Sequence, residues 1–300
     1  MRAAGLTTRF EEARPRLRAF AYRMLGSLDD ADDAVQDAWL RLSRNSADID
    51  NVDAWLTTVV ARICLNMLRA RRARPEEALA DRLPDPIVEA ADGPDPENQA
   101  LLADSVGLAL FVVLDTLPPD ERLAFVLHDV FAVPFEQIAS IADRSPEAAR
   151  KLASRARRRI QQAGPQPDGD IVAQREVVDA FFAAGRAGDF ERLVAVLHPD
   201  VVLRGDFGGS RVRVITGAHA VATQAKLYGS GDRDVCPATI NGAAGAVIFV
   251  KGRPVSVMAF IVREGKVVAI DTLADSARIA RLDLSALSHP GPGHERPHDR

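Results

Sequence analysis

Cysteine, tyrosine and lysine are scarce in this sequence, and long apolar runs are missing from it. The two cysteines, Cys64 and Cys236, stand in different parts of the chain, so we expect neither a disulfide framework nor a zinc site, and no cofactor. The longest apolar stretches, residues 107–114 and 243–250, are much shorter than the about 20 residues that a membrane-spanning helix requires. The N-terminus shows no apolar run followed by a cleavage site, so the sequence gives no sign of secretion. We expect a cytoplasmic protein.

Charge is segregated along the chain, although the net charge of the 300 residues is only −4. Residues 62–74 hold five arginines and no acid, and residues 144–160 hold seven basic residues against the single acid Glu147. Between them, residues 75–97 hold eight acids against Arg82 alone. Two basic segments around an acidic connector suggest two contacts with a polyanion, although either segment alone could equally be a solvated helix face.

Apolar spacing divides the first half of the chain into two helical parts. Residues 8–74 show helical periodicity, which Gly26-Ser27 interrupts after the first helix. Residues 75–97 contain five prolines as well as the acids, a composition typical of an extended linker. Helical periodicity resumes over residues 98–163, and a break rich in proline and glycine follows at 164–169.

The spacing of apolar residues changes after this break, and residues 170–287 predict an α+β domain with a mostly antiparallel sheet. Two short helical patterns are followed by alternating segments rich in valine and isoleucine. Three dipeptides mark tight turns between strands: Asn241-Gly242, Lys251-Gly252 and Glu264-Gly265. Residues 288–300, rich in proline, glycine and histidine, are expected to form a disordered tail.

The strongest local signal is a helix-turn-helix pattern at residues 134–160. A turn at 142–144 follows a short helix, and Ser145 and Pro146 suit the N-cap and first position of the next helix. The residues of that helix expected to face inward are Ala149, Leu152, Ala156 and Ile160. Its outer face is expected to carry Ser145, Arg150, Lys151, Ser154, Arg155 and Arg158. Such a helix suits the major groove, where arginine contacts either guanine or phosphate.

This part of the chain resembles region 4 of the extracytoplasmic-function sigma factors. The resemblance covers four segments: residues 117–122, 125–131, 134–139 and 145–160. In that family, region 4 reads the −35 promoter element. The resemblance therefore implies that the outer face of the second helix contacts −35 DNA.

The front of the chain resembles sigma region 2. Residues 32–40 are similar to region 2.2, which in the family docks on the β′ clamp helices of RNA polymerase, and this implies polymerase contact by Asp33, Gln36, Asp37, Leu40 and Arg41. Residues from Asp53 onward resemble regions 2.3 and 2.4, which melt and read the −10 element. The side chains implied to hold opened DNA are Arg62, Asn66, Arg69, Arg71 and Arg72.

The whole chain resembles the sigma-factor subgroup with a fused C-terminal SnoaL-like domain of NTF2-like architecture. Its linker signature Trp-Leu-Pro-Glu-Pro is matched without the tryptophan by Leu83, Pro84, Asp85 and Pro86. A second signature, Asp-Gly-Gly-Gly-Lys, is matched by Asp206, Gly208 and Gly209, and a third, Asn-Pro-Asp-Lys-Leu, survives poorly at residues 275–279. The resemblance implies that this domain packs on the linker or the sigma domains and modulates polymerase engagement.

Some relatives of this architecture are enzymes with a buried carboxylate base, and Asp206, Asp271 and His198 are the candidates here. The predicted strands offer no tyrosine to stabilise an enolate, so we expect a non-catalytic domain.

We therefore predict a multidomain chain, not an enzyme, in which two all-α sigma domains precede an α+β SnoaL-like cone. Its expected function is to bind core RNA polymerase, through the β′ clamp helices and β subunit, and to direct transcription from specific promoters. Two alternatives remain open: a ligand-responsive helix-turn-helix regulator, and an isomerase or hydrolase fused to a DNA-binding module.

Overall fold

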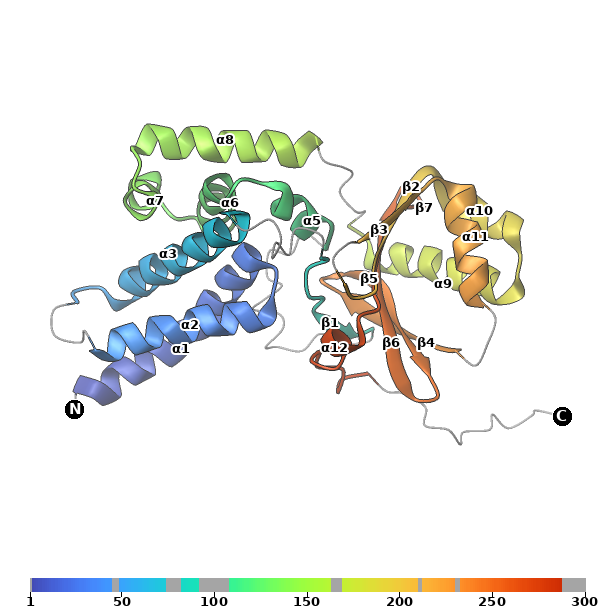
Figure 1. Ribbon diagram of the computed structural model, residues 1–300, viewed down its shortest axis with the longest axis horizontal. Coiled ribbons are helices and arrows are strands. Elements are labelled where there is room, and N and C mark those ends of the chain that lie inside the picture. Colours follow the sequence, from blue (N-terminus) through green and yellow to red (C-terminus); the bar gives the residue numbers. More distant parts are fainter. Residues whose placement is uncertain are drawn as a thin grey trace. The chain divides into compact units, whose positions relative to one another are not determined.

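The computed structural model describes residues 2–44, 49–73, 82–91, 108–162, 169–209, 212–229 and 233–287 (Figure 1). The chain forms two compact units. The first contains residues 1–80, 96–105 and 110–164, and the second contains residues 81–95, 106–109 and 165–300. Much of the expected linker therefore groups with the C-terminal part. The expected tail and the rest of the linker lie outside the described residues.

Three long helices open the first unit: α1 (Arg2–Leu25), α2 (Leu28–Arg44) and α3 (Val52–Ala73). Gly26, at a φ of 70°, separates α1 from α2, as its position between two apolar periodic segments predicts. One face of α1 is buried throughout: Phe10, Leu17, Phe20, Ala21 and Met24. Because the rings of Phe10 and Trp39 lie 4.8 Å apart, α1 and α2 are packed along their length.

The rest of the first unit contains the predicted helix-turn-helix. The elements are α5 (Leu108–Thr116), α6 (Pro119–Phe125), a π-helical turn η2 (Val126–Val130), α7 (Phe135–Ala142) and α8 (Pro146–Gln162). Asp143 adopts a left-handed conformation that ends α7, and the Ser145 hydroxyl accepts a hydrogen bond from the Ala148 amide at the start of α8. The inner face of α8 is shifted slightly from the expected one, since Ala149, Ala153 and Ala156 are buried while Leu152 and Ile160 are half-buried.

Helices α1–α3 and α5–α8 share an interface within this unit. Two ring pairs cross it: Phe20 with Phe131, and Tyr22 with Phe111. The buried guanidinium of Arg122 on α6 donates from Nε and Nη2 to the Arg23 carbonyl oxygen on α1, at 3.1 and 2.8 Å. A buried cation is stable only when such acceptors replace water, so Arg122 fixes α6 against α1.

The second unit is built on a seven-stranded sheet with the strand order β1-β4-β5-β6-β7-β2-β3. The strands are β1 (Val88–Ala90), β2 (Leu197–Asp206), β3 (Arg213–Thr216), β4 (Arg233–Ile240), β5 (Ala243–Val250), β6 (Arg253–Arg263) and β7 (Lys266–Leu273). Only β2 and β7 pair in parallel. The three predicted turns connect β4 to β7 as hairpins, and both residues of each dipeptide have a positive φ. The expected antiparallel character is confirmed.

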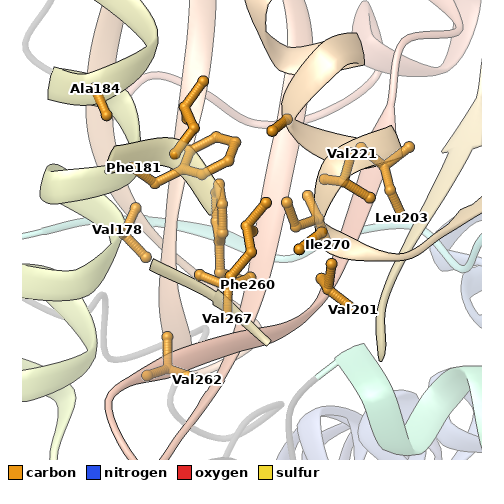
Figure 2. Close-up of a cluster of buried hydrophobic side chains, with 14 of the residues drawn as sticks. Val178, Phe181, Ala184, Val201, Leu203, Val221, Phe260, Val262, Val267 and Ile270 are labelled. Atoms are coloured by element: carbon orange, nitrogen blue, oxygen red, sulfur yellow. The ribbon is translucent and has the colours of Figure 1, made fainter. Parts of the chain in front are cut away.

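Three helices cover one face of this sheet: α9 (Ile171–Ala187), α10 (Phe190–Val196) and α11 (Ala218–Gly229). The sequence pattern predicted the first two and missed α11. Apolar side chains from helices and strands fill the space between them, with Phe260 in contact with Phe181 and Phe182 (Figure 2). This side of the domain is therefore a packed core.

The opposite face of the sheet is covered by the linker, by the short helix α12 (Ser276–Ile279) and by the segment that ends at Leu287. Apolar residues from these segments pack on strands β4 to β7: Val88, Ile279 and Leu287. The strand β1 comes from the linker and pairs with β4, which the sequence pattern did not predict. Among the described residues, no helix is long and apolar enough to cross a membrane.

Candidate nucleic-acid and partner interfaces

The expected polymerase-contact residues form an exposed stripe on α2. Ala34, Val35 and Ala38 are buried on the inner side of this helix. All five predicted residues lie outside that side and are exposed: Asp33, Gln36, Asp37, Leu40 and Arg41. Leu40 is 41% exposed, although it is a large apolar side chain. An exposed leucine beside Asp37 and Arg41 suits a protein partner better than it suits solvent.

Other acids of α2 have internal roles. Arg18 forms two hydrogen bonds with Asp32, of 2.6 and 3.1 Å, and Arg71 pairs with Asp30 at 2.6 Å. These pairs tie α2 to α1 and α3. They divide the acidic residues of α2 into a structural set and an exposed set, and the predicted contacts belong to the exposed set.

The residues expected to contact −10 DNA lie on α3 in two different environments. Arg71, beyond its pair with Asp30, donates to the Leu25 carbonyl oxygen and holds the first three helices together. The side chains of Arg62, Asn66, Arg69 and Arg72 are exposed. Arg62 and Arg69 nevertheless have partners elsewhere in the first unit, the Ser140 carbonyl oxygen and the Asp120 carboxylate.

The expected −35 residues all lie on the exposed face of α8. Arg150 pairs with Glu136 at 2.9 Å and lies over the ring of Phe135, and Lys151 pairs with Glu147 at 2.7 Å. The exposed members of the set are Ser145, Arg150, Lys151, Ser154, Arg155 and Arg158. Surface ion pairs of this kind contribute little to stability, so these side chains can exchange their carboxylates for phosphates at small cost.

Two further arginines of α8 point toward acids of their own domain. Arg157 pairs with Asp129 at 2.7 Å, and Arg159 pairs with the buried carboxylate of Glu121 at 3.1 Å. The seven basic residues counted in the sequence therefore do not act as one set. Arg155, 58% exposed, also lies 3.9 Å from Glu121, so the division between structural and exposed arginines on α8 is gradual.

The candidate catalytic groups of the second unit are engaged in structural contacts. Arg204 forms two hydrogen bonds with the buried carboxylate of Asp271, of 2.5 and 3.1 Å. Nδ1 of His198 accepts from the Asp200 amide, a local contact at the surface. Asp271 is opposite Ala259 in the sheet and lines a small cavity beneath linker residues Leu83, Pro84 and Pro86. A carboxylate paired with arginine is poorly suited to act as a general base.

Asp206, the third candidate, belongs to what we call the Arg278 cluster, formed by Arg278, Asp85 and Asp206. Arg278 Nη1 is 2.6 Å from Asp206, and its Nε donates to Asp85 at 3.0 Å. The guanidinium also donates to the Leu83 carbonyl oxygen at 2.6 Å, and the Leu83 amide donates to Asp206 at 3.2 Å. The three side chains are 4 to 17% exposed, so the cluster is largely shielded from water.

The cluster unites the three signature segments recognised in the sequence, which come from the linker, the end of β2 and α12. The backbone amide of Gly208, two residues after Asp206, donates to the Asp206 carboxylate at 3.1 Å. It has a φ of 81°, and a Cβ there would lie 3.3 Å from a carboxylate oxygen of Asp275, the N-cap of α12. Gly208 therefore allows the β2 end to approach α12 closely. Gly209 also has a positive φ.

Backbone pairing extends the contact between the linker and the second unit. The Ile87 amide donates to the Asn241 side chain at 2.7 Å, and the Asn241 amide donates to the Ile87 carbonyl oxygen at 2.9 Å. The strand β1 then continues along β4. Residues 83–90 are thus held by side-chain ion pairs at one end and by a strand ladder at the other.

The described residues contain no group of three or more histidine, cysteine or acidic side chains that could hold a metal ion. The cysteines are free and lie in different units. Burial raises the pKa of the Cys64 thiol well above its usual value, so this side chain is an inert part of the core.

Comparison with known proteins accords with the geometry of both units. The chain matches the families Sigma-70 region 2 over residues 9–74 and Sigma-70 region 4 over residues 108–160. It is 38% identical to the ECF RNA polymerase sigma factor SigJ of Mycobacterium tuberculosis, over 96% of this chain and 98% of that protein. A probable ECF sigma factor of the same species, SigI, is 33% identical over 87% of this chain and 90% of its own length.

The crystal structure of Mycobacterium tuberculosis SigJ superimposes with a TM-score of 0.74 at 37% identity, covering 93% of this chain and 99% of that one. The helices are therefore those of a promoter-recognition factor of the sigma-70 class, followed by an α+β domain. The chain belongs to the extracytoplasmic-function sigma factor family. The resemblance and the fold class stated from the sequence are confirmed.

The sequence analysis missed the side chains whose partners are far away in the sequence. Arg278 stood in the poorest of the three signature matches, Asp120 stood in the region 4 resemblance without a role of its own, and Arg204 stood in no motif. The only local signal for Arg278 was the acidic N-cap of a short helix at Asp275. Nothing local indicates that an arginine near the end of the chain pairs with an aspartate of the linker.

We predict that the Arg278→Met variant releases the linker. The change leaves the carboxylates of Asp85 and Asp206 without their cation and weakens the holding of residues 83–90 by about 2 kcal/mol. Trypsin cleaves the linker only when it is released, so the cleavage rate follows the population of the released form. Trypsin should therefore cut the full-length variant after Arg82 about 30-fold faster than it cuts the parent, as measured by mass spectrometry. Arg263→Met is the control, because Arg263 is half exposed and pairs only with the neighbouring Glu264 among the described contacts. Equal cleavage of both variants would contradict the prediction.

Proposed function

We propose that this protein binds core RNA polymerase and directs initiation at promoters with defined −10 and −35 elements, in the cytoplasm. The observation that carries the proposal is the exposed stripe of α2, with Leu40 next to Asp37 and Arg41, in a chain that also exposes a basic helix-turn-helix. An ordinary helix-turn-helix regulator has no use for the α2 stripe. An enzyme would need a free carboxylate, whereas Asp206 and Asp271 are both paired with arginine.

Separate surfaces would serve the two promoter elements. On α3, Arg62, Asn66 and Arg69 are three and four residues apart and share one face, which suits the phosphates and bases of an opened strand. On α8, the N-terminal residues Arg150 and Lys151 are placed to reach base edges, and Arg158 lies farther along the helix, where a duplex backbone passes.

The C-terminal domain would modulate this activity through the linker. Residues 83–90 lie between the two sigma domains in the sequence and are bound to the C-terminal domain by the Arg278 cluster and β1. A linker that carries a bound folded domain has fewer conformations in which both sigma domains can engage their targets. The domain would thus act as a restraint fused to the chain.

A first prediction concerns polymerase binding. Asp37→Ala removes an exposed carboxylate from the α2 stripe, and we expect about tenfold weaker association with core RNA polymerase and a matching loss of run-off transcription. Asp179→Ala, on an exposed position of α9, is the control and should behave like the parent. If the parent protein itself neither binds core polymerase nor directs initiation, the proposed function is wrong.

A second prediction concerns the −35 element. The structure gives Arg158 no ion-pair partner among the described residues, whereas Arg157 pairs with Asp129. Arg158→Gln should weaken binding to a −35 duplex several-fold and lower the dependence of log K on log salt by about one. Arg157→Gln removes the same charge from the same helix and should change the salt slope much less. Identical slopes for both variants would argue against the assigned face.

A third prediction concerns the C-terminal domain. Arg278→Met frees the linker from its restraint, and run-off transcription by the full-length variant with core polymerase should rise about threefold over the parent. Arg263→Met should leave the output unchanged. This comparison is preferable to deleting the domain, because deletion would also expose Leu83, Ile87 and Val88, which the domain buries. Unchanged output in both variants would show that holding the linker has no regulatory effect.

A further inference from the structure

One aromatic ring on α7 contacts an arginine of the surface assigned to the −35 element. Phe135 is the first residue of α7, and Cζ of Arg150 on α8 lies over its ring, 5.4 Å from the ring centroid. The same guanidinium donates from Nη2 to the Glu136 carboxylate at 2.9 Å. A ring and a carboxylate from the start of α7 therefore determine together where this guanidinium lies.

The ring of Phe135 is itself supported by the π-helical turn η2. The imidazole of His128, in this turn, packs on it with the ring centroids 3.8 Å apart and the planes tilted by 31°. Nδ1 of His128 lies 3.2 Å from the Val133 carbonyl oxygen, which can only accept, so the imidazole donates and is fixed in turn. These contacts form a series from η2 through α7 to α8, and such support keeps a binding side chain in one geometry.

The other basic side chains on the outer face of α8 have no ring beneath them. Among the residues that the structure describes, Lys151, Arg155 and Arg158 are exposed and lie over no aromatic ring. Lys151 pairs with Glu147 of its own helix, and Arg155 lies 3.9 Å from Glu121. Side chains held this loosely suit phosphates, which carry no sequence information, whereas a base edge has to be met in one orientation.

We infer that Phe135 is a positioning residue that makes Arg150 the base-reading arginine of α8, with guanine as its target. A guanidinium over a ring keeps its edge open, and two adjacent N–H donors at that edge match O6 and N7 of guanine. Arg150 follows Pro146, the first residue of α8, by about one turn, so it lies in the part of a recognition helix that contacts base edges. The inference rests on the −35 function proposed for α8 and goes beyond it, because it assigns the base preference to one arginine and the control of that arginine to α7.

Glu136 is the acceptor that guanine would replace. The side chains of Arg150 and Glu136 are 55% and 66% exposed, and exposed ion pairs of this kind contribute little to stability. The carboxylate can therefore give way to the acceptors of a base, while the ring stays under the guanidinium. Holding Arg150 in advance lowers the conformational entropy that is lost when it docks on a base. Without the ring, the arginine keeps its charge and is free to turn to a phosphate.

The test compares full-length Phe135→Leu with Phe131→Leu. Phe131 is half-buried like Phe135, and its ring also lies under a guanidinium, that of Arg23 at 5.5 Å, but Arg23 is buried on α1. The probe is a pool of duplexes in which the −35 element is randomised, so that no promoter sequence has to be known. Sequencing of the bound duplexes gives the preference for each base at each position, and fluorescence anisotropy gives the affinity for the selected duplex.

We expect the parent to prefer guanine at one position about tenfold, and Phe135→Leu to lower this preference to about threefold at that position alone. Arg150→Lys keeps the charge without the fork of donors and should lose the preference at the same position. Phe135→Tyr keeps the ring and should restore it, and Phe131→Leu should leave the preference at every position unchanged. Replacement of this guanine by 7-deazaguanine, which lacks the N7 acceptor, should weaken binding of the parent about fivefold and binding of Arg150→Lys much less.

A uniform loss of affinity in Phe135→Leu, with the guanine preference intact, would mean that the ring only stabilises the fold, and it overturns the inference. Arg150→Lys keeps the test decisive if Phe135→Leu does not fold, because the side chain of Arg150 is exposed and its exchange leaves the core intact. A guanine preference that survives in Arg150→Lys overturns the inference as well. So does a parent that prefers guanine at no position.

Run-off transcription with core polymerase separates these failures from a failure of the proposed function. If the parent directs initiation from a promoter with the selected −35 element while Phe135→Leu prefers the same bases equally, the protein is a sigma factor in which Phe135 does not position Arg150. If the parent selects no sequence and directs no initiation, the outer face of α8 is not a promoter surface, and the function and the inference fall together.

Discussion

Competition between internal carboxylates and DNA phosphates for the same guanidinium groups governs this structure. Arg69 and Arg150 lie on surfaces assigned to DNA, yet each pairs with an aspartate or glutamate of the first unit. Such exposed pairs are worth about 1 kcal/mol or less, and a polyanion that offers several phosphates at once can displace them. The net charge of −4 therefore does not oppose DNA binding, because the acids near the basic helices are exchangeable partners.

Burial separates the exchangeable ion pairs from the permanent ones. In the Arg278 cluster the side chains are at most 17% exposed, and screening by salt reaches such a pair weakly. At the contact between Arg69 and Asp120 the side chains are 45% and 24% exposed, so salt weakens it. The same residue chemistry thus gives a lasting attachment of the linker to its domain and a reversible contact between the sigma domains.

Local patterns predicted most of the fold, and long-range pairing accounts for what they missed. The turn at Asn241-Gly242, the turn at 142–144 and the cap at Ser145 depend on neighbouring residues alone, and all were predicted. Strand β1 was missed because Val88–Ala90 is an edge strand only when β4 is beside it. Arg278 and Asp120 were missed as contacts for the same reason, since their partners are distant in sequence. The exposure of the chosen residues on α2 and α8 required only helical periodicity, whereas their roles come from the resemblance and stay predictions.

The C-terminal domain keeps the expected architecture, but the surface that makes its contacts with the linker is the outer face of the sheet. Between helices and sheet, Phe181, Phe260 and their neighbours form a buried apolar core. The outer face of the sheet instead holds the linker, through a strand ladder and an arginine placed between two aspartates. Asp206, a candidate base in the sequence, instead pairs with Arg278 and accepts a hydrogen bond from the Leu83 amide of the linker. Because that segment joins the two helical domains in the sequence, the proposed regulation needs no contact beyond the anchor itself.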